Sequence, residues 1–333
     1  MKQKTILVAG GAGYIGSHML RLLRNADYRI IVLDNFNNGH RQAVQGFACV
    51  EVDLLDHAKL VALFKKEKID AVIHFSALIE VGQSVKDPQL YYFNNLVGTI
   101  NLLQVMLAHD IKHFVFSSTA AVYGEPQYTP IDEQHIIAPI NPYGRSKAMV
   151  EQLLADYAHA YGLNYTVLRY FNAAGAHPNG EIGECHEPES HLIPNILTSI
   201  LEKTGPLKIF GDDFDTPDGT CIRDYIHVMD LCQAHLLALQ QLFSYGGSYH
   251  YNLGNGKGFS VKEVIKSAEN VIKQPIPYQV HARRPGDPAI LIANSRLIQN
   301  ELGWKPHYHN LEVIIGHAWF FLKNRMNNLR KTG

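Results

Sequence analysis

The sequence opens with a short apolar run that leads into a glycine-rich turn and then an amphipathic stretch. Residues 5–9 are apolar apart from the first, and Gly10, Gly13 and Gly16 follow at intervals of three. Such glycines allow a sharp bend and let the backbone approach a pyrophosphate at the N-terminus of the next helix. The order strand, glycine turn, helix therefore predicts a dinucleotide-binding unit, although the usual spacing is Gly-x-Gly-x-x-Gly.

Acidic residues end the next two expected strands. Asp34 follows the apolar run 29–33, and Asp53 with Leu54 follows 48–52. A carboxylate at the end of the second strand accepts hydrogen bonds from the adenosine ribose and repels a 2′-phosphate. The pattern therefore favours NAD over NADP, while the nearby Arg41 is a weaker argument for NADP.

Apolar strands and amphipathic helices alternate as far as residue 175. This alternation predicts an α/β fold with a Rossmann-type doubly wound parallel sheet, which binds ligands at the carboxyl ends of its strands. We expect a NAD-binding domain at 1–175 and a smaller mixed α/β domain at 176–333, from which a segment within about 220–255 is a candidate to return to the large domain. The expected strands are 5–9, 29–33, 48–52, 71–75, 114–118, 165–169, 207–210 and 249–253, the last two in the second domain, and the expected helices are 59–66, 90–109, 142–161, 192–203, 228–243 and 261–272.

A tyrosine and a lysine lie four residues apart at the start of one expected helix. Asn141 is a good N-cap and Pro142 a good first helical residue, so Tyr143 falls in the first turn. The spacing places Lys147 on the same helix face as Tyr143. An adjacent ammonium and the positive end of the helix dipole both favour a phenolate. We therefore expect the pKa of Tyr143 to lie nearer neutrality and this residue to serve as a general base.

Composition excludes several other classes of function. The net charge is −1, so nothing indicates binding to nucleic acid or to an acidic membrane surface. No apolar run approaches the ~18 residues of a membrane span, and the N-terminus leads directly into the first strand without a signal peptide. We expect a cytoplasmic protein. The segment 186–191 resembles a metalloprotease helix, but its histidines are five residues apart and Pro188 interrupts it, so no metal site is predicted.

With these features, and with the hydroxyl-rich end of the fifth strand at Thr119, the chain resembles extended short-chain dehydrogenases/reductases. Within that family it is similar to the nucleotide-sugar epimerases, from residue 5 to about residue 323. The glycine turn is common to the whole superfamily, whereas the later runs are more selective for nucleotide-sugar epimerases. The segments that carry the resemblance are 10–18, 169–172, 175–178, 223–231 and 283–287.

The resemblance implies reversible 4-epimerisation of UDP-glucose and UDP-galactose through a 4-keto intermediate, with bound NAD, in a homodimer. It implies three catalytic residues: Tyr143 accepts the proton of the sugar 4-hydroxyl, Thr119 relays it, and Lys147 holds the nicotinamide ribose. The implied cofactor-binding residues are Gly10, Gly13, Tyr14, Ile15, Gly16, Asp34, Asn35, Asp53, Leu54, Phe75, Ser76, Ala77, Asn94, Tyr143, Lys147 and Phe171. The implied substrate-binding residues of the second domain and the catalytic helix are Thr119, Tyr143, Asn172, His191, Leu192, Phe210, Arg223, Arg284 and Asp287.

Three alternatives stay open. A nucleotide-sugar dehydratase is disfavoured, because Ala120 and Ala121 stand where related dehydratases carry an acid pair. An epimerase of another UDP-sugar (an N-acetylhexosamine, glucuronate or a pentose) would use the same hydride chemistry, and Leu291 has an intermediate size where side-chain volume is thought to control access of N-acetyl groups. A non-catalytic NAD-binding regulatory module is disfavoured by the intact set of Thr119, Tyr143 and Lys147.

Overall fold

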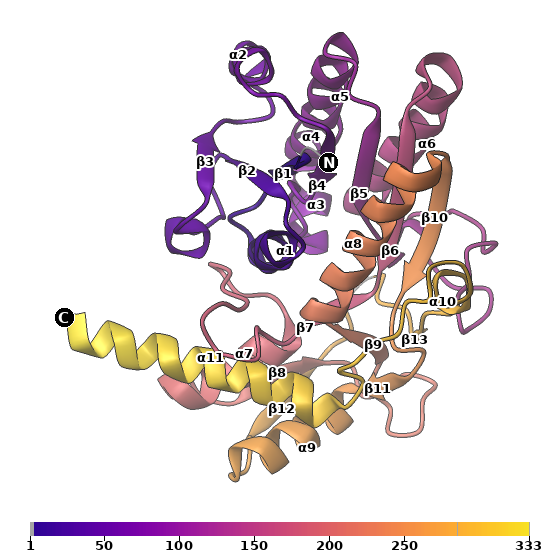
Figure 1. Cartoon of the computed structure of the whole chain (residues 1–333). Coiled ribbons are helices and arrows are strands. Elements are labelled where there is room, and N and C mark those ends of the chain that lie inside the picture. Colours follow the sequence, from indigo (N-terminus) through magenta and orange to yellow (C-terminus); the bar gives the residue numbers. More distant parts are fainter. Residues whose placement is uncertain (1–2, 285, 333) are drawn as a thin grey trace.

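The computed structural model describes residues 3–284 and 286–332. Its largest element is a parallel sheet with the order β10-β6-β5-β4-β1-β2-β3 (Figure 1). Its central strands are buried on both faces, as their nearly continuous apolar sequences predict. The strands are β1 (Thr5–Ala9), β2 (Arg29–Asp34), β3 (Ala48–Glu51), β4 (Ala71–His74), β5 (His113–Thr119), β6 (Asn164–Tyr170) and β10 (Ser248–Leu253).

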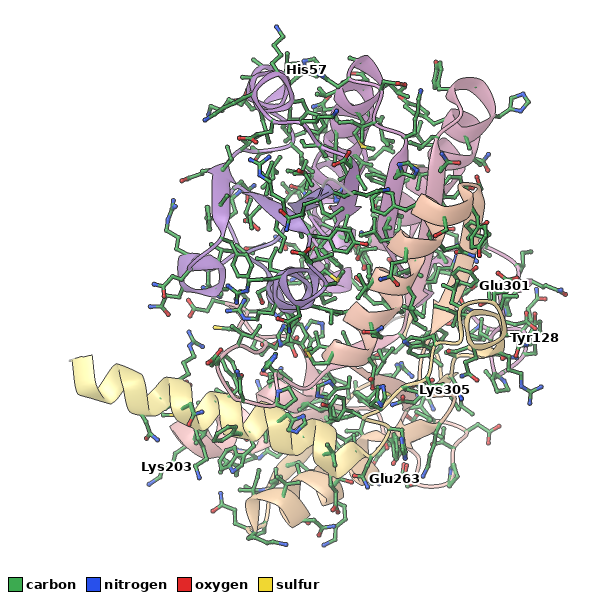
Figure 2. All side chains as sticks on the ribbon, viewed as in Figure 1. His57, Tyr128, Lys203, Glu263, Glu301 and Lys305 are labelled. Carbon is green, nitrogen blue, oxygen red and sulfur yellow. The ribbon has the colours of Figure 1, made fainter. Side chains whose placement is uncertain are left out.

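Helices cover both faces of this sheet. The helices α1 and α8 share one hydrophobic core with the sheet, and α2, α5 and α6 share a second core on the opposite face. Figure 2 shows side chains filling both layers, while the exposed His57 lies at the outer edge. The helices of the two layers are α1 (Tyr14–Asn25), η1 (Arg41–Val44), α2 (His57–Lys66), α3 (Val81–Lys86), α4 (Pro88–Tyr91), η2 (Tyr92–Val97), α5 (Gly98–Ala108), η3 (Ala120–Val122), α6 (Pro142–Tyr161) and α8 (Val228–Tyr245).

The helix expected at 90–109 contains a π-helical segment, η2, between α4 and α5. Asn95 lies in this segment, and its side-chain amide accepts a hydrogen bond from Leu78 N (2.8 Å) and donates one to Leu78 O (3.0 Å). The amide also donates to Ser146 Oγ at 3.2 Å. The widened turn thus ties the segment after β4 to α6, next to the tyrosine and lysine. π segments frequently occur at functional sites.

The strand order places a topological switch point beside β1. β1 pairs with β2 on one side and with β4 on the other, with Ala9 opposite both Leu33 and His74. The connections leave β1 and β4 in opposite directions, so a crevice forms at the carboxyl ends of these two strands. This is the edge at which the glycine turn and Asp34 are found.

The remaining chain forms a smaller unit below this edge (Figure 1). It contains a four-stranded sheet (β11-β9-β13, with β7 on β9), a two-stranded sheet (β12-β8) and a core shared by α7, α9 and α11. Among the described residues, no helix is long and apolar enough to cross a membrane. The elements of the smaller unit are β7 (Asn172–Ala174), α7 (Leu192–Glu202), β8 (Leu207–Phe210), β9 (Ile222–His227), β11 (Gly258–Ser260), α9 (Val261–Ile272), β12 (Tyr278–His281), β13 (Ile290–Leu291) and α11 (Leu311–Thr332). α10 (Arg296–Leu302) instead packs against α8 and β10 of the large domain.

One expected strand belongs to a different sheet from the one predicted. The strand at 249–253 was placed in the second domain, but it is β10 and pairs in parallel with β6 at the edge of the large sheet. α8, which precedes it, packs against α1 on one face of the same sheet. The segment from α8 to β10 therefore lies with the large sheet, within the range 220–255 considered for such a return. The physical reason is that α8 is apolar around most of its circumference and buries that surface between the sheet and α1.

Candidate active site

The carboxyl edge of the large sheet and the smaller unit enclose a cleft of about 1360 Å³. This volume exceeds the ~300–1,000 Å³ of typical small-molecule pockets and suits two large ligands side by side. All residues predicted as catalytic, cofactor-binding or substrate-binding line this one cleft. Positions 10 to 77 of that set come from the glycine turn, the start of α1 and the ends of β2, β3 and β4, and Asn94 comes from η2. Those from 172 onward come from the smaller unit.

The glycine turn lies too close to its neighbours to accommodate side chains at two positions. A Cβ on Gly10, whose φ is +78°, would lie 2.6 Å from Ser76 N, and a Cβ on Gly16 would lie 2.2 Å from Gly10 O. Gly13 is the N-cap of α1, and its lack of a side chain leaves the first amides of the helix without a side-chain cap. Free amides at the positive end of a helix suit a bound phosphate. The turn thus fits the pyrophosphate of a dinucleotide.

Asp34 links the glycine turn to the end of β2. Its carboxylate accepts hydrogen bonds from Ala12 N and Phe36 N, both at 2.9 Å, and its exposed fraction is 6%. Burial raises the pKa of this carboxyl, and the two amides partly oppose the rise. Arg41 does not neutralise Asp34, because its guanidinium pairs with Glu51 at 2.5 Å. The environment at the end of β2 therefore suits a ribose with free hydroxyls better than a ribose phosphate.

Asp53 is held on the neighbouring strand end. Its carboxylate accepts hydrogen bonds from the side chain of Asn35 and from Leu55 N, both at 2.8 Å. Leu54 beside it is buried. A polar group next to an apolar wall can accommodate the edge and the face of a purine.

The helix that carries the tyrosine and the lysine begins as predicted. The side chain of Asn141 accepts a hydrogen bond from Gly144 N at 2.8 Å, and Pro142 is the first residue of α6. Lys147 is buried one turn later and donates from Nζ to Ser117 O at 2.8 Å. Burial lowers the pKa of Lys147 to about 7. The carbonyl at the end of β5 therefore fixes the lysine at the floor of the cleft.

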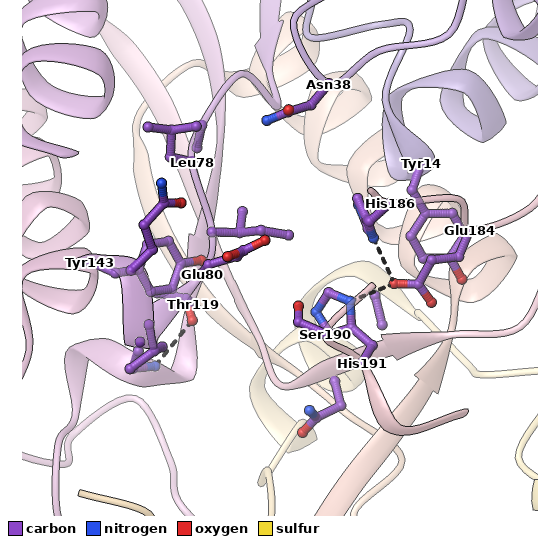
Figure 3. Close-up of a pocket in the computed structure, with 18 of the residues that line it drawn as sticks. Tyr14, Asn38, Leu78, Glu80, Thr119, Tyr143, Glu184, His186, Ser190 and His191 are labelled. Atoms are coloured by element: carbon purple, nitrogen blue, oxygen red, sulfur yellow. Dashed lines mark hydrogen bonds and ion pairs between the residues drawn. The ribbon is translucent and has the colours of Figure 1, made fainter. Parts of the chain in front are cut away.

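The prediction that the pKa of Tyr143 lies nearer neutrality is wrong for the protein alone. Burial of its hydroxyl raises the pKa to about 12, and a hydrogen bond with Thr119 opposes the rise. Lys147 does not lower it as predicted, because its ammonium is held by Ser117 O and is itself poorly solvated. A phenolate at this position needs a further positive charge nearby. Figure 3 shows Tyr143 beside Thr119 on the same wall of the cleft.

The opposite wall carries two arginines bound to one carboxylate. Arg284 Nε lies 2.9 Å from Asp287 Oδ2, and Arg223 lies 3.7 Å from Asp287 Oδ1. The Arg284 guanidinium also lies 5.0 Å from the centre of the Phe210 ring. Two planar cations in one cleft suit a diphosphate, which accepts paired hydrogen bonds. Asp287 holds both in place.

The sequence prediction missed two residues beside the predicted His191, namely Glu184 and His186. His191 is the N-cap of α7, and its Nδ1 lies 2.7 Å from Glu184 Oε1 (Figure 3). Burial opposes protonation of both imidazoles, but Glu184 and Glu189 outweigh it and raise the pKa of His186 to about 9 and of His191 to about 10. The residues 186–191 were discounted because they do not fit a helix, and they meet only because this segment is a loop.

Comparison with known proteins agrees with this geometry. Residues 6–254 match the NAD dependent epimerase/dehydratase family. The chain belongs to this family. The match covers the whole large sheet, including α8 and β10.

The chain is similar in sequence and in structure to several UDP-glucose 4-epimerases. The UDP-glucose 4-epimerase of Halalkalibacterium halodurans is 53% identical over 314 residues, which cover 94% of each chain. The crystal structure of UDP-glucose 4-epimerase from Brucella ovis in complex with NAD is 46% identical, with a TM-score of 0.92 over 96% of this chain and 98% of that one. The enzyme from Bifidobacterium longum, solved with NAD⁺ and UDP, is 38% identical, with a TM-score of 0.92 over 97% of this chain and 99% of that one.

Proposed function

We propose that this protein is an NAD-dependent epimerase that interconverts UDP-glucose and UDP-galactose. One observation carries the proposal: three groups of residues line the same cleft. They are the glycine turn, the set of Thr119, Tyr143 and Lys147, and the two arginines, Arg223 and Arg284, that suit a diphosphate. Relatives that match nearly the whole chain and bind NAD or UDP support it. The acid pair expected of a dehydratase is absent from the cleft at Ala120 and Ala121, which both line it.

NAD, when bound, supplies a hydride acceptor and donor, and its cationic ring favours a nearby phenolate. Gly10, Gly13 and Gly16 leave room for its pyrophosphate, and Asp34 accepts hydrogen bonds from its ribose. The proposed cofactor contacts are completed by the residues that line the same part of the cleft, Tyr14, Ile15, Asn35, Asp53, Leu54, Phe75, Ser76, Ala77, Asn94 and Phe171.

Tyr143 and Thr119 transfer the proton, and Lys147 binds the cofactor beside them. Tyr143 as phenolate accepts the proton of the sugar 4-hydroxyl, and Thr119 lies within hydrogen-bonding reach to relay it. Lys147, fixed by Ser117 O, donates hydrogen bonds to the nicotinamide ribose and so positions the cofactor beside Tyr143. The proton returns by the same route when the sugar is reduced from its other face. The high pKa of Tyr143 in the protein by itself implies that this base forms only once the cofactor is in place.

The smaller unit holds the nucleotide and leaves the sugar free to turn. Arg223 and Arg284 bind the diphosphate, and Asp287 aligns both guanidiniums. Because both cations bind the diphosphate, no ionic contact fixes the hexose ring. The ring can therefore rotate and present either of its faces to the cofactor. The other proposed substrate contacts, which also line the cleft, are Asn172, His191, Leu192 and Phe210.

We further propose that the enzyme is a homodimer formed through α4, η2 and α6. Leu90, Phe93 and Met149 are exposed apolar side chains on these elements. Exposed apolar side chains that gather on one surface favour a protein interface. Light scattering at several concentrations, with Phe93→Glu as the disrupting variant, tests this assembly.

The activity is tested by incubating the purified protein with UDP-glucose, without added NAD, and following the sugar by NMR. We expect conversion to UDP-galactose until both are at equilibrium, with no net NADH formed. Stoichiometric NADH would instead identify a dehydrogenase, and loss of the C6 hydroxyl a dehydratase. Extraction of the bound nucleotide should yield NAD or NADH, and mainly NADP would contradict the role of Asp34.

A further inference from the structure

The loop before α7 gathers two imidazoles and two carboxylates at the side of the cleft. Glu184, His186, Glu189 and His191 each offer one ligand atom, and these four atoms lie within 4.8 Å of one another. Glu184 Oε1 lies 2.7 Å from His191 Nδ1 and 3.4 Å from His186 Nδ1. Oxygens of Glu189 lie 3.4 Å and 3.7 Å from the same two nitrogens. Figure 3 shows both imidazoles turned toward Glu184.

The two imidazole nitrogens do not make ordinary hydrogen bonds, whereas the Glu189 carboxylate accepts bonds from Ser190 N (2.8 Å) and His191 N (2.9 Å). The Nδ1 atoms of His186 and His191 are buried, and neither has a partner that meets hydrogen-bond geometry, although carboxylate oxygens lie close by. Hydrogen-bonded groups point at each other, whereas the ligands of an ion point at a common centre. Tetrahedral ligands at bond lengths of ~2.0–2.1 Å are about 3.3 Å apart. The nitrogen–oxygen separations in the cluster, measured to Glu184 Oε1 and to both oxygens of Glu189, run from 2.7 to 3.7 Å and lie on both sides of that value.

The two carboxylates of the cluster need compensating positive charge, which either two protons on the imidazoles or one bound cation can supply. The Glu184 side chain is 5% exposed, and within the described parts of the chain no Lys or Arg lies within ion-pair distance of it or of Glu189. Two carboxylates with two neutral imidazoles carry a charge of −2, which one divalent ion would neutralise. Mixed imidazole and carboxylate ligands suit Zn²⁺ and similar transition metals, whereas Mg²⁺ and Ca²⁺ prefer oxygen ligands alone. We infer that Glu184, His186, Glu189 and His191 form a binding site for a divalent transition-metal ion of the Zn²⁺ type.

The proposed site is structural. Four protein ligands complete a tetrahedral shell and leave no position for substrate or water. The ion would hold residues 184–191 against the start of α7, of which His191 is the N-cap. It would also fix this loop against the segment before η1, since His40 Nε2 lies 2.7 Å from Cys185 O. It would therefore stiffen the contact between the two walls of the cleft without taking part in proton transfer.

The test uses the purified protein after treatment with a chelator and removal of that chelator. ZnCl₂ is titrated calorimetrically, and CoCl₂ is added in parallel so that the visible spectrum reports the ligand set. We expect one ion per chain, at least a tenfold weaker affinity in His186→Ala and in Glu189→Gln, and no comparable response to MgCl₂. The matched control is Glu187→Gln, on the same loop, whose carboxylate is 83% exposed and outside the cluster. It should bind zinc like the wild type.

Zinc should also raise the unfolding temperature of the wild type and of Glu187→Gln, because it binds only the folded state. No such rise is expected for His186→Ala. Absence of stoichiometric binding to the wild type would show that the cluster is held by protonated histidines alone and would overturn the site. Glu189→Gln preserves the shape of the side chain. If this variant bound zinc as tightly as the wild type, the proposed site would also be overturned, even if His186→Ala failed to fold. None of these measurements depends on epimerase activity, so they are separate from the test of the proposed function.

Discussion

On the sheet side of the cleft, backbone atoms hold the functional groups, whereas on the opposite side the functional side chains hold one another. Lys147 is bound by the carbonyl of Ser117 and Asp34 by the amide of Ala12, both within the large domain. Arg223 and Arg284 are instead joined through Asp287, and among the described residues only Arg223 has a backbone partner as well, Ile222 O at 2.9 Å. The backbone of a packed sheet has little freedom, so the first wall is rigid. The second wall depends on ion pairs between flexible side chains.

The two walls have different roles in the proposed reaction. Proton transfer needs reacting atoms at defined distances, and groups fixed by a sheet edge satisfy that need. A sugar that must present both of its faces to the cofactor has to be bound tightly at its diphosphate and remain free to rotate at the hexose ring. Cations on loops and short strands provide the grip without enclosing the sugar. Damage to the first wall should therefore lower the rate of turnover, and damage to the second should weaken substrate binding.

The largest expected effect is on the first wall. Tyr143→Phe should lower kcat by ~10² or more, a typical loss when a general acid–base group is removed. The fold and the bound NAD should be retained, because the ring still fills its place on α6. Initial rates with UDP-galactose and the nucleotide content of the purified variant measure the two effects. Near wild-type turnover would remove Tyr143 from the mechanism and show that this wall only positions the ligands.

The second prediction separates backbone crowding from cofactor contact in the glycine turn. Gly16→Ala places a Cβ 2.2 Å from Gly10 O, so it should destabilise the fold by ~1–3 kcal/mol and release NAD. Gly13→Ala is the matched control, because its Cβ meets no atom closer than 3.4 Å and its φ is −78°. Its unfolding temperature should stay close to that of the wild type, while NAD binds more weakly. Equal thermal stability of the two variants would contradict the crowding argument.

The third prediction concerns the second wall. Arg223→Lys and Arg284→Lys should raise KM for UDP-glucose about tenfold, or ~1.4 kcal/mol, with a smaller change in kcat, because lysine cannot bind a phosphate in a bidentate manner. The effect should be larger at Arg223, which is 11% exposed, than at Arg284, which is 57% exposed. Arg283→Lys is the control, since this neighbour pairs with Asp213 at 2.5 Å. A loss of kcat at unchanged KM would contradict the division between the walls.

The last prediction concerns the pH dependence of stability, which tests the packing of the large domain without a substitution. Burial lowers the pKa of His18, His74 and His227 to about 3 and of His235 to about 4. The unfolded chain titrates its histidines near ~6.5, so below that pH it binds more protons than the folded protein, and stability falls as pH falls. Each histidine contributes a slope of up to about 1.4 kcal/mol per pH unit. Asp224, whose pKa burial raises to about 6, opposes one of the four below that pH. His186 and His191, whose pKa values are raised, have the opposite slope only above pH ~6.5, so they do not reverse the fall between pH 6.5 and 5.5.

The measurement is the unfolding temperature at pH 7.5 and at pH 5.5, which should be lower at pH 5.5. An unchanged value would mean that these histidines are already solvated, and that the packing of the large domain is looser than the structure shows. The first wall would then lose the rigidity on which the comparison depends.

Local sequence determined much of the cofactor wall. The glycine spacing, the acids at the ends of β2 and β3, and the Asn141–Pro142 start of α6 each follow from a few adjacent residues. Strand, turn and cap preferences act over such short distances, so these features could be predicted without a fold. The second wall was named only through resemblance to a family, because its arginines lie on short strands and loops with little periodicity.

Tertiary structure decided what depends on burial and on contacts between distant segments. The sequence suggested that Lys147 lowers the pKa of Tyr143, but burial of the hydroxyl and the bond from Lys147 to Ser117 O reverse the direction. It placed a returning segment only within the broad range 220–255 without identifying β10 as the strand that joins the large sheet, and it gave no reason for Glu184 to meet His191. Spacing along a chain fixes which side chains share one helix or strand. Solvation, and the meeting of separate elements, are fixed only when the whole chain packs.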